Sequence, residues 1–260
     1  MRFFFVLCLL LAIVQAKPYN DKALKKIANT PAKEHYCFAV MGDNRDGDDI
    51  FKRILSKLNK EDLVFVINNG DLVSYGFSYE FKSYVKRIKK TQTPVVSVIG
   101  NHEIPLFGGR GNFREYIGKP YFSFAYSDSF FIILDNANKR RIKGRQLHWL
   151  KKQLQISKRY KNRFVFLHVP LFDPRKGDRK KGHSMKDKKN AIYLNKLFDK
   201  YHITMVFASH IHSFLQGKWG KTPFIITGGA GAPQDRDHGY PHYIRVCVDK
   251  KKVFYTIKRL

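Results

Sequence analysis

Short apolar runs recur along the chain, and five of them are followed at once by aspartate, asparagine or histidine. They cover residues 38–43, 63–71, 95–103, 164–168 and 205–212, and the third reads VVSVIGNHE. Runs of this length, rich in β-branched and aromatic residues, predict buried strands. In open α/β sheets, ligands bind at the carboxyl ends of the strands. We therefore expect the polar residues that follow these five strands to share one site.

Segments with helical periodicity alternate with the predicted strands. Helices are predicted at residues 51–58, 78–90, 146–156 and 191–201. A hairpin is expected at residues 121–126 and 130–134, and closing strands at residues 222–227 and 242–258. Loops are expected at residues 107–119, 174–190 and 228–241. This order predicts one α/β domain over residues 35–260 with two packed sheets, preceded by a polar lead-in segment at residues 17–34.

The first sixteen residues predict a signal peptide. A short positive start, Met1-Arg2, precedes twelve apolar residues, and the stretch ends in the small-residue site Val14-Gln15-Ala16. Twelve residues are too few to span a bilayer comfortably. An uncleaved membrane anchor is the alternative. Cleavage near Ala16 predicts an exported protein, either periplasmic or secreted.

The charge of the chain is strongly positive. Lys and Arg number 49 against 21 acidic residues, a net charge of +28, and cleavage after Ala16 leaves 48 basic residues and a charge of +27. Such a charge favours a phosphorylated anionic substrate, nucleic acid or an anionic membrane surface as partner. A solvated, lysine-rich surface is the alternative, and no obligate protein partner is evident. Eight of the positive charges lie at residues 175–189, in a loop that also contains His183.

Two cysteines, Cys37 and Cys247, remain after signal cleavage, and both lie in or next to predicted strands. An exported protein can keep a disulfide. Two buried free thiols are equally compatible with the sequence.

The polar residues that follow the strands form a donor set for two cations. Carboxylate, amide and imidazole ligands come from Asp43, Asp71, Asn101, His168, His210 and His212. A carboxylate such as Asp71 can bridge two ions held about 3.5–4 Å apart. Mixed oxygen and nitrogen donors without thiolate suit Zn, Mn or Fe. His102, beside Asn101, is placed to protonate a leaving oxygen as a general acid.

The five blocks, in chain order GD, GD, GNHE, H-x-P and SHIH, resemble the calcineurin-like metallophosphoesterase superfamily, which includes purple acid phosphatases and phosphodiesterases. The resemblance covers residues 38–232. It implies a four-layer αββα sandwich of two mixed β-sheets flanked by helices. It also implies hydrolysis of phosphomonoester or phosphodiester bonds by a hydroxide that bridges two metal ions. One ion would take Asp43, Asp71 and His212, and the other Asp71, Asn101, His168 and His210. His102 matches the leaving-group histidine of the family.

The chain departs from the family pattern at Arg45. The first block of the family is usually D-x-H with a ligating histidine, but an arginine side chain stays protonated and cannot ligate a cation. Purple acid phosphatases carry a tyrosine ligand three residues after the second aspartate, where this chain has Ser74. We therefore expect weak occupancy of the first metal site. Arg45 either holds a substrate phosphate as a catalytic residue or pairs with Asp46 or Asp48.

Two functional classes remain open. The first is a metal-dependent phosphoesterase acting on monoesters or diesters. The second is a non-catalytic, exported polyanion-binding protein on a degenerate phosphoesterase scaffold, which Arg45 and the positive charge would favour.

Overall fold

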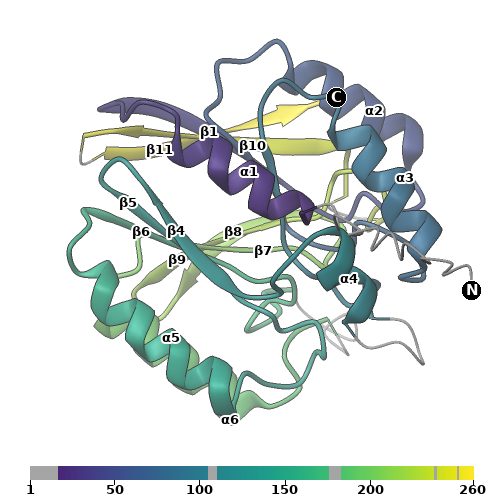
Figure 1. Cartoon of the computed structure of the whole chain (residues 1–260). Helices are drawn as coiled ribbons and strands as arrows, with labels where there is room; N and C mark the ends of the chain where they lie inside the picture. Colours follow the sequence, from purple (N-terminus) through teal and green to yellow (C-terminus); the bar gives the residue numbers. More distant parts are fainter. Residues whose placement is uncertain (1–16, 105–109, 176–182, 237–238, 251) are drawn as a thin grey trace, which may run out of the picture.

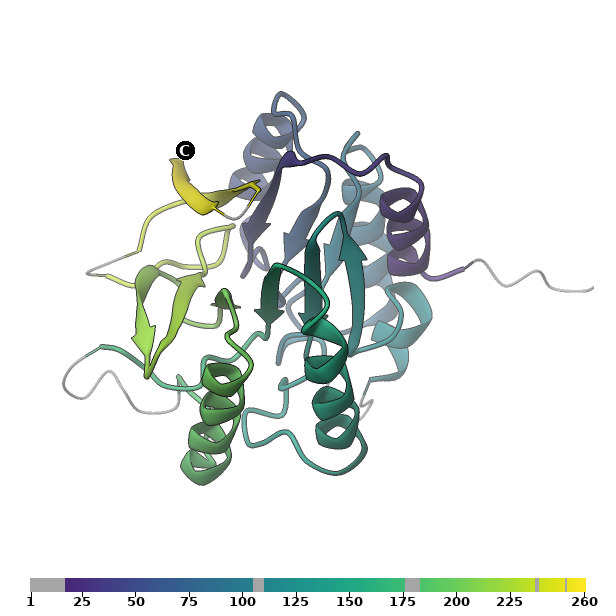
Figure 2. The same cartoon turned by 90° about the vertical axis from the view of Figure 1, so that its left-hand side faces the viewer.

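The structure is a computed structural model that describes residues 17–104, 110–175, 183–236, 239–250 and 252–260. The predicted signal peptide lies outside these residues, as do residues 176–182 of the basic stretch at residues 175–189. Two sheets pack face to face between two layers of helices, as the resemblance implied (Figure 1; Figure 2).

The first sheet has the strand order β11-β10-β1-β2-β3. Its parallel strands are β1 (His35–Met41), β2 (Val66–Asn68) and β3 (Val95–Ser97), and its antiparallel strands are β10 (His242–Asp249) and β11 (Lys252–Arg259). Side chains alternate across a strand. In β1, Phe38 and Val40 accordingly face the second sheet, while Ala39 and Met41 face the outer helices.

The second sheet has the strand order β4-β5-β6-β7-β9-β8. Its four central strands run parallel: β5 (Ser129–Ile133), β6 (Asn162–Phe166), β7 (Met205–Ala208) and β9 (Thr222–Thr227). The edge strands β4 (Phe122–Tyr126) and β8 (Phe214–Trp219) run antiparallel to their neighbours. Every residue of β5 and β7 is buried, because both faces of this sheet are covered.

Helices cover the outer face of each sheet (Figure 1). On the first sheet lie α2 (Asp48–Leu58) and α3 (Ser78–Ile88), with α4 (Gly111–Tyr116) packed on α3. On the second sheet lie α5 (Gly144–Ser157) and α6 (Lys188–Lys200). In α2 the buried residues are Phe51, Ile54, Leu55 and Leu58, which form one face at helical spacing.

Aromatic rings fill the space between the two sheets. Phe38 of β1 lies 5.2–5.5 Å from the rings of Phe65, Phe131 and Phe164, measured between centroids. Such offset and edge-on contacts stabilise a core beyond the area that they bury. The two sheets are therefore joined by a continuous apolar layer, and the ends of their strands are held at fixed positions relative to each other.

The lead-in segment contains a helix, α1 (Tyr19–Ala28). Ala23 and Ile27 are buried in the cluster between the sheets. The side chain of Asn20 donates to the carbonyl of Ser97 at 2.8 Å and accepts from its N–H at 2.9 Å. Helix α1 thus extends the hydrogen bonding of β3 and covers the side of the sandwich near β3 and β4.

Three features differ from the sequence expectations, and one alternative that the sequence left open is decided. The predicted loop at residues 107–119 contains α4, and β8 was not predicted. Residues 242–258 form two strands, β10 and β11, rather than one run. Cys37 and Cys247 are bonded, across directly paired positions of β1 and β10. Within the described ranges, no helix is both long enough and apolar enough to cross a bilayer.

Candidate metal centre

The predicted ligands meet at one edge of the sandwich. Asp43 follows β1, Asp71 follows β2, and His168 and His210 follow β6 and β7 of the other sheet. The backbone N–H of His210 donates to Asp43 Oδ2 at 2.9 Å, which ties the two sheets together at this edge. The structure therefore brings together side chains that lie more than 150 residues apart in the chain.

Two groups of donor atoms are close enough to hold one cation each. Asp71, His168 and His210 form one group, and Asp43, Asp71 and His212 form the other. Within each group the donor atoms lie within 4.8 Å of one another. Asp71 belongs to both groups, so its carboxylate has the position of a bridge between two ions.

Three of these residues adopt left-handed backbone conformations that the sequence pattern did not indicate. The φ angles are 59° at Asp43, 54° at Asp71 and 68° at His210. Asp and His are among the side chains that tolerate this region best, yet it costs free energy relative to ordinary conformations. At these three residues the strain lies in the turns that aim the side chains at a common point.

Two of the histidines are oriented by backbone carbonyls. His168 Nδ1 lies 2.9 Å from the carbonyl oxygen of Asn69, and His212 Nδ1 lies 2.6 Å from that of Pro233. A carbonyl can only accept, so both rings carry their proton on Nδ1 and turn Nε2 toward the carboxylates. This arrangement, in which the second ring nitrogen donates to a carbonyl, is typical of histidines that ligate metals.

Three buried polar atoms at the centre make no hydrogen bond with the described residues. They are Asp43 Oδ1, Asn101 Oδ1 and His168 Nε2. A buried acceptor without a partner is costly, and unexplained cases in a native structure indicate a functional role or an ion. Oxygen and imidazole donors are also the ligands that Zn, Mn and Fe accept. The residues therefore fit a metal centre.

The charges of the cluster also fit a metal centre. Burial raises the pKa of Asp43 to about 6. Burial would also raise the pKa of Asp71, but the charge of His168 holds it well below its usual range. For His168, burial favours the neutral ring, but Asp71 outweighs it and raises the pKa to about 9. The two carboxylates therefore favour a positive charge between them.

His102 lies beside the ligand cluster with a fixed ring orientation. Its backbone N–H donates to Asp71 Oδ1 at 3.0 Å, and its Nδ1 donates to the carbonyl of Ser74 at 2.7 Å. Its Nε2 is consequently directed toward the centre, 3.9 Å from Asp71 Oδ2. Burial lowers the pKa of this imidazole, and the charge of Asp71 opposes that effect.

Arg45 lies close to the ligand group formed by Asp43, Asp71 and His212. Its Nη1 pairs with Asp46, which is one of the two aspartates that the sequence analysis named as partners for Arg45. Its Nε lies 3.8 Å from Asp71 Oδ2 and makes no hydrogen bond to any residue that the structure describes. A fixed positive charge therefore stands beside the shared carboxylate, where the family pattern usually has a ligating histidine.

Glu103 has a structural role at the centre that sequence reasoning missed. Its buried carboxylate accepts from the backbone N–H groups of four residues at 2.6–3.1 Å: Asp71, Leu72, Val73 and Gly100. A Cβ at Gly100 would lie 2.3 Å from the backbone nitrogen of Asp71, so only glycine allows this approach. Glu103 is the last residue of the GNHE block, so its position was visible in the sequence although its hydrogen bonds were not.

The predicted loops at residues 107–119 and 174–190 are described only in part. The ring of His183 lies 5.9 Å from that of His210, and its buried Nδ1 makes no hydrogen bond within the described ranges. Residues 176–182 and 105–109 fall outside them. Arg110, in the predicted loop at residues 107–119, makes a bidentate pair with Asp135.

The sequence matches the family model of the calcineurin-like phosphoesterases over residues 37–214. The chain belongs to this family, and the family implies divalent or trivalent metal ions. It is 25% identical over 234 residues to "Purple acid phosphatase 21" of Arabidopsis thaliana, a match that covers 79% of this chain and 52% of that protein. The chain thus spans about half the length of this curated relative.

Solved structures with the same fold come from diverse proteins. The purple acid phosphatase PPD1 of yellow lupin superposes with a TM-score of 0.69 and 14% identity, covering 88% of this chain and 52% of that one. GAP50 of Plasmodium, titled "the anchor in the inner membrane complex", superposes with a TM-score of 0.64 and 14% identity, covering 86% and 84%. At these identities the likeness establishes the fold alone.

Proposed function

We propose that the chain is a metal-dependent phosphoesterase that hydrolyses phosphomonoester or phosphodiester bonds at a two-ion centre. The observation that carries this proposal is the pair of ligand groups that share Asp71. Three buried donor atoms at the same point, which make no hydrogen bond within the described residues, support it.

The ligand assignment follows the two groups. Asp71, Asn101, His168 and His210 would hold one ion, and Asp43, Asp71 and His212 the other. When bound, ions of this kind supply Lewis-acid chemistry: they activate water near neutral pH and neutralise the charge of a phosphoryl group. Mn, Zn and Fe all suit these donors.

The remaining steps are assigned to side chains of this protein. His102 would donate a proton from Nε2 to the leaving oxygen, because its Nδ1 is already held by the Ser74 carbonyl. The charge of Asp71 stabilises the protonated ring, and the negative charge of an arriving phosphate adds to this effect. The guanidinium of Arg45, which lies beside Asp71, would bind a phosphoryl oxygen of the substrate.

The test is hydrolysis by the mature chain from Lys17, supplied with Mn or Zn. An aryl phosphate monoester and the matching bis-aryl diester separate phosphatase from phosphodiesterase activity. Asp71→Asn should lower kcat/KM at least 100-fold, because it removes the shared ligand charge, and it should also lower the bound metal measured by mass spectrometry. Asp62→Asn, an exposed carboxylate, is the matched control. Wild-type turnover by Asp71→Asn would contradict the two-ion mechanism.

The second candidate is a protein that binds polyanions without turnover. The cation at Arg45 favours it, as does the GAP50 structure, whose title describes an anchor. Salt-sensitive binding of nucleic acid or anionic vesicles, with no hydrolysis above the Asp71→Asn background, would establish it.

Export is part of the proposal. The Cys37–Cys247 disulfide supports an oxidising compartment, and the first sixteen residues have the pattern of a cleaved signal. Amino-terminal sequencing of the protein recovered from its native host, with Lys17 expected first, tests this.

A further inference from the structure

Three aromatic side chains lie exposed in a row beside the metal centre. Tyr75, Phe77 and Tyr79 leave 67%, 49% and 67% of their surface in solvent. The ring centroids of Tyr75 and Phe77 are 6.2 Å apart, and those of Phe77 and Tyr79 are 5.8 Å apart with planes inclined by 17°. We call these three side chains the aromatic strip. Exposed apolar groups that adjoin one another in this way mark an interaction site.

The backbone beneath the strip is held in place. The carboxylate of Glu80 accepts from the N–H groups of Ser74, Tyr75 and Phe77 at 2.8–3.2 Å. The side chain of Asn112 donates to the carbonyl of Gly76 at 2.8 Å. The rings are therefore presented to solvent by a segment that needs little further ordering when a ligand binds.

One end of the strip adjoins the proposed general acid. Tyr75 follows Ser74, whose carbonyl accepts the hydrogen bond from His102 Nδ1. Nε2 of His102, the nitrogen that would donate to a leaving group, faces the centre from the opposite side of this ring. The imidazole ring of His102 thus lies between the beginning of the strip and the proposed position of the leaving group.

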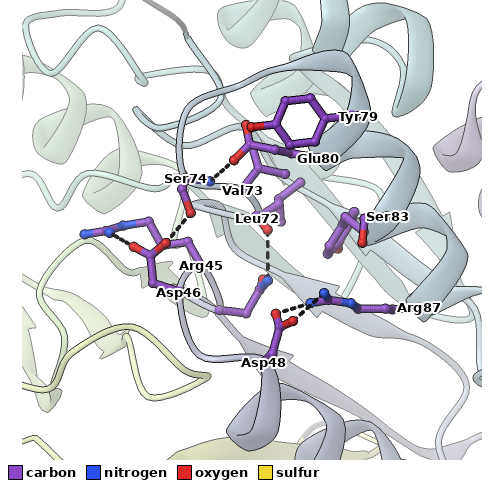
Figure 3. Close-up of a pocket in the computed structure, with 12 residues that line it drawn as sticks. Arg45, Asp46, Asp48, Leu72, Val73, Ser74, Tyr79, Glu80, Ser83 and Arg87 are labelled. Atoms are coloured by element: carbon purple, nitrogen blue, oxygen red, sulfur yellow. Dashed lines mark hydrogen bonds and ion pairs between the residues drawn. The ribbon is translucent and has the colours of Figure 1, made fainter.

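The other end of the strip borders a cavity of about 230 Å³, which Tyr79, Ser83 and Arg87 help to line (Figure 3). The acidic groups of its wall are already compensated. Asp48 makes a bidentate pair with Arg87, and Asp46 pairs with Arg45 and accepts from the hydroxyl of Ser74. Glu80 also lines the cavity and accepts from backbone N–H groups. The cavity is therefore a polar space whose acidic groups are already engaged.

We propose that the aromatic strip and this cavity bind the base of a nucleotide whose phosphate lies at the metal centre. The proposal rests on the proposed phosphoesterase function and names its substrate class. Nucleobases stack on exposed aromatic side chains with little dependence on sequence, and the net charge of +28 attracts their phosphates. A free mononucleotide and the terminal nucleotide of a nucleic acid present the same chemistry here.

The experiment compares kcat/KM for adenosine monophosphate, glucose phosphate and glycerol phosphate. The variants are Phe77→Ala and the triple change Tyr75→Ala, Phe77→Ala, Tyr79→Ala, with Phe254→Ala as the control because Phe254 is a similarly exposed aromatic residue on β11. The triple variant should lose at least tenfold more on the nucleotide than on glycerol phosphate, mainly through KM. Equal losses on all three substrates, or equal losses on nucleotide and sugar phosphate, would overturn the proposal.

Binding gives a second readout that does not depend on turnover. Calorimetric titration of the protein with adenosine monophosphate should give a Kd at least tenfold weaker in the triple variant than in Phe254→Ala. If no substrate is hydrolysed, the phosphoesterase proposal fails, but this titration still decides whether the strip binds a base. An unchanged Kd would overturn the inference. A further arm with a 5′-phosphorylated oligonucleotide identifies the source of the nucleotide, since tighter binding than the mononucleotide supports a nucleic-acid end.

Discussion

Arg45 combines two properties that bear on metal binding. It removes a ligand that the family usually provides, and it places a guanidinium 3.8 Å from the carboxylate that both ion sites share. Both effects weaken the site formed by Asp43, Asp71 and His212, whereas the site with His168 and His210 keeps all its donors. The two sites should consequently differ in affinity.

Arg45→His should raise the bound metal from about one to about two ions per chain after dialysis, because it restores an imidazole ligand. Inductively coupled plasma mass spectrometry measures this ratio. Arg45→Gln separates the causes, since it removes the charge without supplying an imidazole. Two tightly held ions in the unaltered protein would contradict the prediction.

Individual residues also mark the limit of sequence reasoning at the site. The identities of Asp43, Asp71 and His210 could be read from the strand ends, but their left-handed backbone could not. The four hydrogen bonds to Glu103 depend on two loops meeting in space. Such contacts follow from the packing of the sheets and leave no periodic signal in the chain.

At the scale of elements, apolar runs with strong periodicity were predicted correctly. β8 was missed because FLQGKW contains a glycine and a lysine and has only one fully buried residue, Trp219. The turn between β10 and β11 was missed although the charged residues Asp249, Lys250 and Lys252 interrupt the apolar pattern there. The pairing of Cys37 with Cys247 depends on the register between β1 and β10, which cysteine positions alone do not define.

The disulfide links β1 to β10 across 210 residues of chain. Cys37→Ser with Cys247→Ser should lower the free energy of unfolding by about 3–5 kcal/mol, because a long closed loop restricts the unfolded chain. Denaturant titration of the oxidised protein and of the double variant measures the difference. Reductant should lower the denaturant midpoint of the unaltered protein to that of the double variant. Equal denaturant midpoints of the two proteins before reduction would refute the prediction.

A buried hydrogen bond joins β9 to β10, between the hydroxyl of Thr227 and His242 Nε2 at 3.1 Å. Burial lowers the pKa of His242 to about 4. Between pH 6.5 and 4, His242 therefore binds a proton in the unfolded chain but not in the folded protein. The contribution of His242 to the free energy of unfolding is complete above pH 6.5 and decreases as the pH is lowered toward 4. The loss from this group is about 3 kcal/mol. His242→Gln should flatten the pH dependence of the unfolding midpoint over this window. A slope equal to that of the unaltered protein would exclude His242 as a cause.

At the scale of the whole molecule, the positive charge is the dominant feature. The excess of 49 basic over 21 acidic residues produces a positive field, which would attract the proposed anionic substrate before contact. Salt screens such a field over about 10 Å at 0.1 M ionic strength. Raising the ionic strength about tenfold should therefore increase KM for a phosphate ester and leave kcat nearly constant. Steady-state kinetics in NaCl, with sucrose as a neutral control, measure this, and a KM independent of salt would contradict it.

The position of β1 has a consequence for biosynthesis. This strand is made early, yet one of its two neighbours in the sheet is β10, which a ribosome reaches some 200 codons later. Contacts so distant in sequence form slowly, because a long segment must be brought to closure first. The first sheet therefore cannot be completed before β10 has been made, and oxidation of Cys37 with Cys247 reports that β10 has docked on β1.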